Sequence, residues 1–232
     1  MGSIKENLEV IHKNINEACK RAGRDTSEVT LISVSKTKPV SDILEAIAAG
    51  ERDFGENYVQ ELVAKTEEIK DDLTWHMIGP LQSNKVKKAV KAASIIHSVH
   101  SISIAETINK EAAKLGKIQD ILIEINVGSE LSKHGIDISE AEEVTLEIAK
   151  LDNLRIRGYM CIPPIAEDKD ANRLYFRELK QLSDKMNKDH SDILHLDMLS
   201  MGMSSDYETA IEEGATHVRV GTAIFGARNY NK

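Results

Sequence analysis

The chain has 232 residues, a length that suits one α/β barrel domain and can bury a substantial core. Hydrophobic residues make up 41% and charged residues 29%, which excludes a mainly disordered chain and indicates a soluble globular protein. The formal net charge of −8 argues against a nucleic-acid-binding protein, which usually shows a basic excess or stripe.

The predicted elements alternate between strands and helices after one leading helix. Apolar residues step by threes and fours from Ile4 to Ala22 and end at Gly23, which predicts an amphipathic helix with a glycine stop. Strands are predicted in chain order at 29–36, 52–55, 74–78, 95–99, 118–127, 154–160, 194–199 and 217–220. Helices are predicted between them at 41–49, 57–69, 83–92, 104–115, 139–151, 169–188 and 205–213, the first of them capped by Ser41.

The strand and helix pattern gives eight repeated units and a fold class. Strands that alternate with helices imply right-handed crossovers and a parallel sheet. Eight such units in 232 residues fit a closed (β/α)8 TIM barrel better than an open sheet, although an open doubly wound α/β sheet is the alternative. No linker or shift in composition divides the chain. We therefore expect residues 1–232 to form a single barrel domain.

A lysine stands where the first predicted strand ends. The apolar run up to Val34 stops at Ser35-Lys36, and Pro39 prevents the strand from continuing. A lysine partly desolvated beside apolar groups can serve as a Schiff-base nucleophile, although a solvated lysine at a loop edge is the ordinary alternative. This stretch alone does not separate Lys36 from Lys38.

Two loops near the C-terminus have the composition of a phosphate site. In a TIM barrel, phosphate groups commonly bind after the seventh and eighth strands. Residues 199–204 and 219–226 follow those strands, and each has a small hydroxyl residue beside a glycine at the start of a helical segment. Hydroxyls and exposed main-chain N–H groups together can hold an anion, although either stretch alone also makes an ordinary helix cap.

Arg219 adds a charge to this region. Strand alternation sends Arg219 and Gly221 to the face opposite Val218 and Val220. If Arg219 faces the barrel mouth, it needs an acceptor, which can be a ligand or a carboxylate such as Glu56 or Asp197. A lysine together with a phosphate site suggests a ligand with both an aldehyde and a phosphate, and pyridoxal phosphate has both.

Other residues point to a reduced compartment and to no metal. Cys19 and Cys161 lack the spacing of a disulfide framework or a zinc site. His97 and His100 have no carboxylate or cysteine at ligand spacing, so no metal is expected. No apolar signal segment or membrane span is found, and we expect a cytoplasmic protein without a membrane partner. Lys85, Lys88 and Lys91 recur at helical spacing, which indicates a solvated helix face.

Several blocks of the sequence resemble the signature motifs of the pyridoxal phosphate homeostasis protein family. They are FGENYVQE at 54–61, HMIGPLQSNK at 76–85, SMGMS at 200–204 and VRVGTAIFGAR at 218–228, with further similar blocks at 126–135 and 158–160. The resemblance runs from the leading helix to the C-terminus. Met77, where an aromatic residue is common, is a small departure that affects no functional residue.

The resemblance implies a barrel similar to the N-terminal domain of alanine racemase, with pyridoxal phosphate held as an internal aldimine on Lys36 rather than Lys38. It implies that Ser200 and the Gly221-Thr222 loop hold the phosphate and that Arg219 faces the pyridine nitrogen. The resemblance also implies less direct places in the pocket for three further residues. The sequence alone would assign them to a helix start, to barrel packing and to gap-filling, and they are Asn57, His76 and Met201 respectively.

The resemblance also bears on activity. An arginine beside the ring nitrogen disfavours its protonation and weakens carbanion stabilisation. The racemases that the chain resembles have a second domain that supplies a tyrosine acid/base, and we find no such domain in this sequence. We therefore expect a monomeric carrier or buffer of pyridoxal phosphate in vitamin B6 homeostasis, without racemase activity, with apo forms of pyridoxal phosphate-dependent enzymes as candidate recipients. A low-activity amino-acid racemase is the alternative, and a cofactor-free aldolase that uses Lys36 is a third hypothesis.

Overall fold

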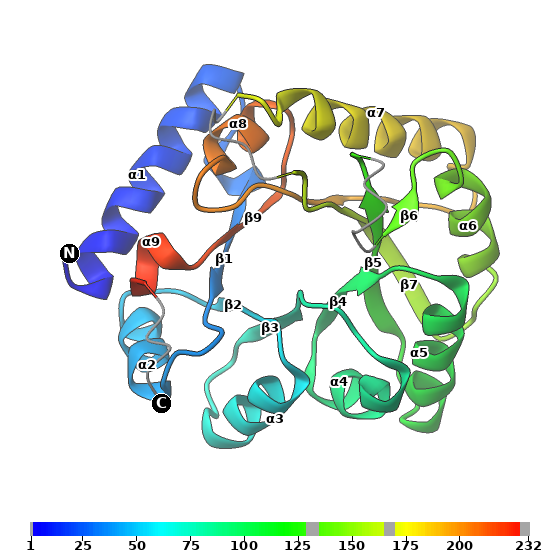
Figure 1. Cartoon of the computed structure of the whole chain (residues 1–232), viewed down its shortest axis with the longest axis horizontal. Helices are drawn as coiled ribbons and strands as arrows, with labels where there is room; N and C mark the ends of the chain where they lie inside the picture. Colours follow the sequence, from blue (N-terminus) through cyan, green and yellow to red (C-terminus); the bar gives the residue numbers. More distant parts are fainter. Residues whose placement is uncertain (1, 129–134, 165–169, 228–232) are drawn as a thin grey trace.

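The computed structural model describes residues 2–128, 135–164 and 170–227. Within these ranges eight parallel strands close into a barrel that helices surround (Figure 1). Around the barrel the order is β1-β2-β3-β4-β5-β7-β8-β9, and β9 pairs again with β1. The strands are β1 (Thr30–Val34), β2 (Asp53–Glu56), β3 (Thr74–Met77), β4 (Ile95–Val99), β5 (Gln119–Asn126), β7 (Leu154–Met160), β8 (Met198–Ser200) and β9 (His217–Val220). The predicted TIM barrel is confirmed.

Helices follow the strands on the outside of the barrel (Figure 1). They are α1 (Ile4–Ala22), α2 (Val40–Ala48), α3 (Val59–Glu68), α4 (Val86–Ala92), α5 (Ile102–Lys114), α6 (Ala141–Ile148), α7 (Arg173–Asp189), α8 (Tyr207–Glu212) and α9 (Thr222–Phe225). Two short 3-10 helices, η1 (Thr26–Glu28) and η2 (Ser83–Lys85), precede β1 and α4. No helix in the described ranges is both long enough and apolar enough to span a membrane.

The leading helix α1 has clear start and stop signals. The Ser3 hydroxyl accepts from the N–H of Glu6, and the Glu6 carboxylate accepts from the N–H of Ser3, which makes a capping box. Gly23 ends the helix in the left-handed region with a φ of 65°. The buried stripe of the helix packs beside α8 and α9, on the side of the barrel where β9 meets β1 (Figure 1).

The buried apolar side chains form two separate sets. The larger set lies between the strands and the helices, and includes Ile96, Ile121 and Val218. A smaller separate cluster consists of Ile95, Leu122, Met160 and Met198, one residue each from β4, β5, β7 and β8. Since neighbouring residues of a strand point to opposite faces, this second cluster faces the barrel interior.

The structure corrects two details of the predicted elements. Helix α2 begins after Pro39, and Ser41 lies inside the helix, because proline is already set to a helix-entry conformation and has no N–H to leave unpaired. The strand predicted at 194–199 is only Met198–Ser200. Its first part is held instead by Asn187, whose side chain bonds both the N–H and the carbonyl of Leu196 at 2.7 and 2.8 Å.

A short strand and one helix boundary also differ. Strand β6 (Ile136–Asp137) pairs with β5 outside the barrel and was not predicted. Helix α7 begins at Arg173, whereas the prediction began it at residue 169, which lies outside the described residues.

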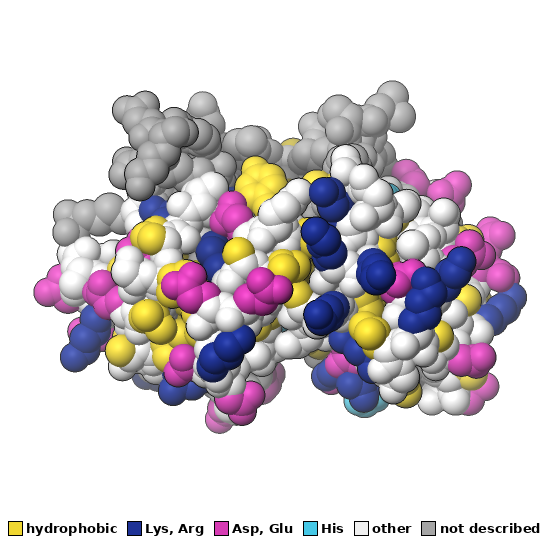
Figure 2. Space-filling view, turned by 90° about the horizontal axis from the view of Figure 1, so that it is seen from below, with side chains coloured by type: hydrophobic (Ala, Val, Ile, Leu, Met, Phe, Trp, Pro, Cys, Tyr) yellow, Lys and Arg dark blue, Asp and Glu magenta, His cyan; other side chains and the backbone are white. Residues whose placement is uncertain are grey.

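The surface charge is uneven although the net charge is negative. Figure 2 shows lysine and arginine side chains gathered over α4 and α5, while acidic side chains are spread more widely. The exposed lysines of these two helices include Lys87, Lys88, Lys91, Lys110 and Lys114. The predicted solvated face is therefore present, although one of its three lysines, Lys85, is half-buried.

Candidate functional site

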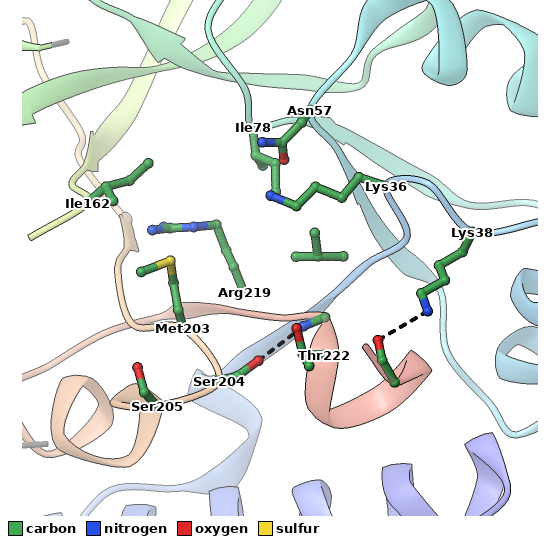
Figure 3. A pocket seen from close by; sticks show the side chains of 13 residues that line it. Lys36, Lys38, Asn57, Ile78, Ile162, Met203, Ser204, Ser205, Arg219 and Thr222 are labelled. Atoms are coloured by element: carbon green, nitrogen blue, oxygen red, sulfur yellow. Dashed lines mark hydrogen bonds between the residues drawn. The ribbon is translucent and has the colours of Figure 1, made fainter. Parts of the chain in front are cut away.

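A pocket of about 280 Å³ opens where the carboxyl ends of the strands meet (Figure 3). Because β1 lies between β2 and β9, the loops that carry Lys36, Asn57 and Gly221 emerge side by side. Small-molecule sites typically have volumes of roughly 300–1,000 Å³, so this pocket suits a compact ligand. It is lined by Val34, Lys36, Lys38, Asn57, Ile78, Ile162, Met203, Ser204, Ser205, Arg219, Gly221, Thr222 and Gly226.

Lys36 presents its side chain to the pocket. It is the second residue after β1, and Figure 3 shows it extending from one side of the pocket toward Asn57 and Ile78. Ile78 is 7% exposed and gives this part of the lining an apolar surface. The amine thus lies where a small ligand at the barrel mouth would meet it.

Lys38 lines the same pocket but is used differently. Its Nζ donates to the carbonyl oxygens of Phe225, Gly226 and Ala227 at 2.7, 3.1 and 3.2 Å. An ammonium has three donors, so these carbonyls occupy all of them and tie the end of α9 to the loop after β1. The geometry thereby distinguishes Lys36 from Lys38.

Arg219 enters the pocket from β9 and is 5% exposed. Its Nη1 donates to Ser200 Oγ at 2.7 Å and its Nη2 donates to the Cys161 carbonyl at 2.8 Å. Burial lowers the pKa of the guanidinium. Neither carboxylate considered from the sequence is its ion-pair partner, because Glu56 pairs with Lys65 and Asp197 pairs with Arg157.

A line of hydrogen bonds leads from Arg219 through the barrel interior. Ser200 Oγ lies 3.0 Å from His97 Nδ1, and His97 Nε2 lies 2.9 Å from His76 Nδ1. His76 Nε2 then lies 2.9 Å from Asp53 Oδ1, at the amino end of β2. The histidines and Ser200 are fully buried, whereas the Asp53 side chain is 27% exposed.

The two ends of this line set the direction of each hydrogen bond. A guanidinium only donates and a carboxylate only accepts. With both rings neutral, His76 therefore donates to Asp53, His97 donates to His76, and the Ser200 hydroxyl, which accepts from Arg219, donates to His97. Burial places the pKa of His97 well below its usual value, which agrees with a neutral ring. Arg219 is thus connected to a distant carboxylate through Ser200, His97 and His76.

His217 packs beside this line, with its ring centre 6.3 Å from that of His76. Burial lowers the pKa of His217 to about 3. His100, which was considered with His97 as a metal pair, instead donates from Nδ1 to the Ser98 carbonyl at 3.1 Å. The two histidines therefore do not share a site.

Glycine at position 221 is required by a close approach. A Cβ atom there would lie 3.1 Å from the Val34 carbonyl oxygen and 3.2 Å from Val34 Cβ. The absence of a side chain lets the loop after β9 lie against β1. Thr222 and Ser204 stand at this wall of the pocket, where the Gly221 N–H donates to Ser204 Oγ at 3.4 Å (Figure 3).

The pocket brings together five of the residues predicted from the sequence, namely Lys36, Asn57, Arg219, Gly221 and Thr222. The other three lie outside its lining. Ser200 and His76 belong to the buried hydrogen-bonded line, and Met201 is fully buried in the larger apolar core.

Sequence reasoning did not assign the pocket's other polar residues, Lys38, Ser204 and Ser205. The sequence identifies the SMGMS block, which ends at Ser204, as part of the site. Nothing in the sequence shows which of the two serines of that block reaches the pocket. Met203 also lines the pocket.

The donor set of the pocket fits a ligand with an anionic group and a carbonyl. Hydroxyls and main-chain N–H groups lie at the Ser204 and Thr222 wall, the Arg219 guanidinium lies deeper, and the Lys36 amine lies opposite. These features define a small-molecule-binding (β/α)8 barrel whose ligand site is at the carboxyl ends of the strands.

Comparison with known proteins identifies the family. A family model described as alanine racemase, N-terminal domain, matches residues 7–229. The chain belongs to this family and, within it, to the pyridoxal phosphate homeostasis proteins. It is 43% identical to the protein of that name from Aquifex aeolicus, over 97% of this chain and 98% of the other. It is 42% identical to the one from Escherichia coli K12, over all of both chains.

Solved structures agree with this assignment. PipY of Synechococcus elongatus, in a structure with PLP bound, is 38% identical and has a TM-score of 0.84, covering 97% of this chain and all of PipY. An alanine racemase of Clostridium difficile has a TM-score of 0.76 at 16% identity, covering 99% of this chain and 57% of the racemase. The likeness to the racemase extends to the fold alone.

Proposed function

We propose that this chain binds pyridoxal 5'-phosphate at the Lys36 pocket and carries it, keeping the reactive aldehyde attached without turning it over. The observation that supports this most directly is the meeting of the Lys36 amine, the Arg219 guanidinium and the Ser204–Thr222 wall in one small pocket. When bound, the cofactor supplies an aldehyde that condenses with a neutral amine, forming a C=N bond and releasing one water. The names of the relatives and the PLP-bound PipY structure support the choice of cofactor.

Each part of the pocket has a proposed task. Thr222 and Ser204 offer hydroxyls to the phosphate, and Gly221 lets that group approach the main chain. Ser200 acts on the ligand through Arg219, because its hydroxyl is engaged beneath the guanidinium. His76 supports the same arginine from further away, and Met201 packs behind the loop.

Arg219 favours storage over catalysis in this proposal. A guanidinium donates hydrogen bonds and stays charged, so it disfavours a proton on a ring nitrogen that it faces. The ring then withdraws electrons weakly. The described lining residues include no carboxyl, imidazole, thiol or phenol group. Their two amines are those of Lys36 and Lys38, and Lys38 is tied to three carbonyls. A second acid or base for racemisation is missing from this described lining.

Absorbance and proton exchange test this function. Purified protein incubated with pyridoxal phosphate should develop the visible band of a C=N-linked cofactor, and borohydride reduction should leave the cofactor's mass on Lys36. The band should be lost in Lys36→Ala and kept in Lys38→Ala, the matched control that also removes one ammonium from the pocket. Amino acids in deuterated water should keep their α-proton.

The other hypotheses predict different results. Rapid α-proton exchange by the loaded protein would favour the racemase. Absence of the band in the wild-type protein would contradict the carrier and favour a barrel aldolase that uses Lys36 without a cofactor.

We also propose that the loaded protein acts as a cytoplasmic monomer and delivers its cofactor to apo forms of pyridoxal phosphate-dependent enzymes. Cys19 and Cys161 are both thiols, which suits a reducing compartment. Transfer to an apo-enzyme should be faster than dissociation into solution, and sedimentation should give the mass of one chain. Transfer limited by free dissociation would contradict direct delivery.

A further inference from the structure

Charged side chains beneath the pocket hold the segment that carries Lys36. On the side before Lys36, the Ser35 carbonyl accepts from Lys65 Nζ at 2.8 Å and the Ser35 hydroxyl donates to Glu56 Oε1 at 2.6 Å. Lys65 Nζ also donates to Glu56 Oε1 at 2.6 Å. The main chain and the side chain of Ser35 are therefore both fixed to one ion pair.

The side after Lys36 is held by the same group of charges. The N–H of Thr37 donates to Glu61 Oε2 at 2.7 Å, and that oxygen also accepts from Lys65 Nζ at 2.9 Å. The cation of Lys65 thus joins the two carboxylates, and each carboxylate bonds a residue adjacent to Lys36. We call these three residues the Glu56–Lys65–Glu61 clamp.

The backbone that the clamp holds is strained. Thr37 has a φ of 63°, and it is the one non-glycine residue with a positive φ in the described ranges. A β-branched residue in this region is an outlier, because its side chain crowds the backbone. Such conformations persist where surrounding contacts determine them, and they concentrate at ligand sites. The bond from Thr37 N–H to Glu61 is such a contact.

The clamp is also costly as a purely structural device. Glu56 is fully buried and Lys65 is 6% exposed. Glu56 Oε2 has no hydrogen-bond partner among the described residues, and burial raises the pKa of this carboxyl. Well-packed apolar residues commonly give equal or greater stability than a buried ion pair. The clamp's bonds to both neighbours of Lys36 indicate what it contributes instead.

We propose that Glu56, Lys65 and Glu61 are positioning residues that fix the main chain around Lys36 so that its amine meets the aldehyde of a bound ligand. This inference rests on the proposed function, and it adds residues that do not line the pocket. Loosening the clamp should slow attachment of the aldehyde and leave the phosphate contacts across the pocket unchanged.

Glu61→Ala is the main test, because Glu61 is partly exposed and its loss leaves the buried Glu56–Lys65 pair in place. The rate of C=N formation with pyridoxal phosphate should fall by about tenfold to a hundredfold, since about 1 Å of misplacement can cost this much. The Kd for pyridoxine 5'-phosphate, which has an alcohol in place of the aldehyde, should stay within about twofold, a change of about 0.4 kcal/mol. Glu61→Gln keeps an oxygen that accepts from Thr37 N–H, so it should restore most of the rate.

Glu67→Ala is the matched control, because Glu67 is exposed on the same helix and its loss changes the charge equally. It should attach the cofactor at the wild-type rate. Lys65→Met gives a second test with both carboxylates released, and it should slow attachment at least as much as Glu61→Ala.

Several results would overturn the inference. One is a wild-type attachment rate in folded Glu61→Ala or folded Lys65→Met. Another is a loss of affinity for pyridoxine 5'-phosphate as large as the loss in the rate of C=N formation, which would show that the pocket as a whole has collapsed. If the wild-type protein itself failed to form the C=N bond, the proposed function would fail; if the wild-type protein formed it and the variants matched its rate, only the clamp would be refuted.

Discussion

Replacing Ser200 by alanine should mainly lower the stability of the protein, whereas replacing Ser204 by alanine should mainly lower the affinity for a phosphate-bearing ligand. Ser200 Oγ is fully buried between Arg219 Nη1 and His97 Nδ1, whereas Ser204 is exposed at the pocket wall. Ser200→Ala leaves one buried donor and one buried acceptor without partners, at about 1–3 kcal/mol each. We therefore expect the free energy of unfolding of the unliganded protein to fall by about 2–6 kcal/mol. Ser204→Ala should change it by less than about 0.5 kcal/mol, as is usual for surface substitutions.

The affinity for a ligand with a phosphate group should be lowered selectively by Ser204→Ala and not by Ser200→Ala. A hydrogen bond to a charged group contributes about 1.5–3 kcal/mol, and at an exposed wall the lower end applies. Ser204→Ala should therefore weaken pyridoxal phosphate binding about tenfold, with the affinity for pyridoxal, which has no phosphate, unchanged. Ser200→Ala should affect both ligands alike, because it acts on Arg219.

Urea unfolding and equilibrium titration with the two ligands measure these effects. The reasoning would be refuted by a Ser200→Ala variant as stable as the wild type that has selectively lost affinity for the phosphate-bearing ligand. That pattern would indicate that Ser200 contacts the phosphate, as the family resemblance implied.

Two further predictions concern acidity and close packing. The pKa of His217 is about 3 in the folded protein and 6.5 in the unfolded chain, so its contribution to stability is fully present above pH 6.5 and is lost as the pH falls toward 3. At pH 5 the neutral ring should lower the free energy of unfolding by about 2 kcal/mol, and His217→Gln should remove this loss from a plot of unfolding free energy against pH; an unchanged slope would contradict a neutral, half-buried ring. Gly221→Ala places a Cβ 3.1 Å from the Val34 carbonyl oxygen, so it should lower stability by about 1–3 kcal/mol and weaken cofactor binding, and wild-type values for both would show that the loop has room to move.

The fold was largely predictable because its signals are local. Strands such as β1 and β4 are rich in β-branched residues, and a glycine follows four of the helices, at Gly23, Gly50, Gly116 and Gly214. The errors came from competing contacts that the sequence does not reveal. Asn187 takes the backbone groups of Leu196 that a longer strand would have used, and this depends on α7 lying beside the segment before β8. Pro39 started α2 where Ser41 offered a more familiar capping residue.

The site was predictable at the level of loops and less so at the level of side chains. Lys36 and Arg219 were found because charged residues at the ends of apolar strands stand out. His97 and His76 were interpreted one at a time, as a weak metal candidate and as a packing residue. Their hydrogen bond joins β3 to β4, and His97 is joined in turn to β8 across the closed barrel. Only barrel closure brings β8 within reach of β4, so neither spacing nor alternation predicts this part of the connection.

The one-way order of the interior hydrogen bonds limits how this barrel can change in evolution. With both rings neutral, each group from Arg219 to His76 donates toward Asp53, so a replacement with a different number of protons leaves its neighbours mismatched on both sides. A protein with a single substitution at Ser200, His97 or His76 is therefore expected to be less stable than the original. Relatives that have altered this interior are expected to differ at adjacent positions of the line together, as linked pairs of substitutions from different strands.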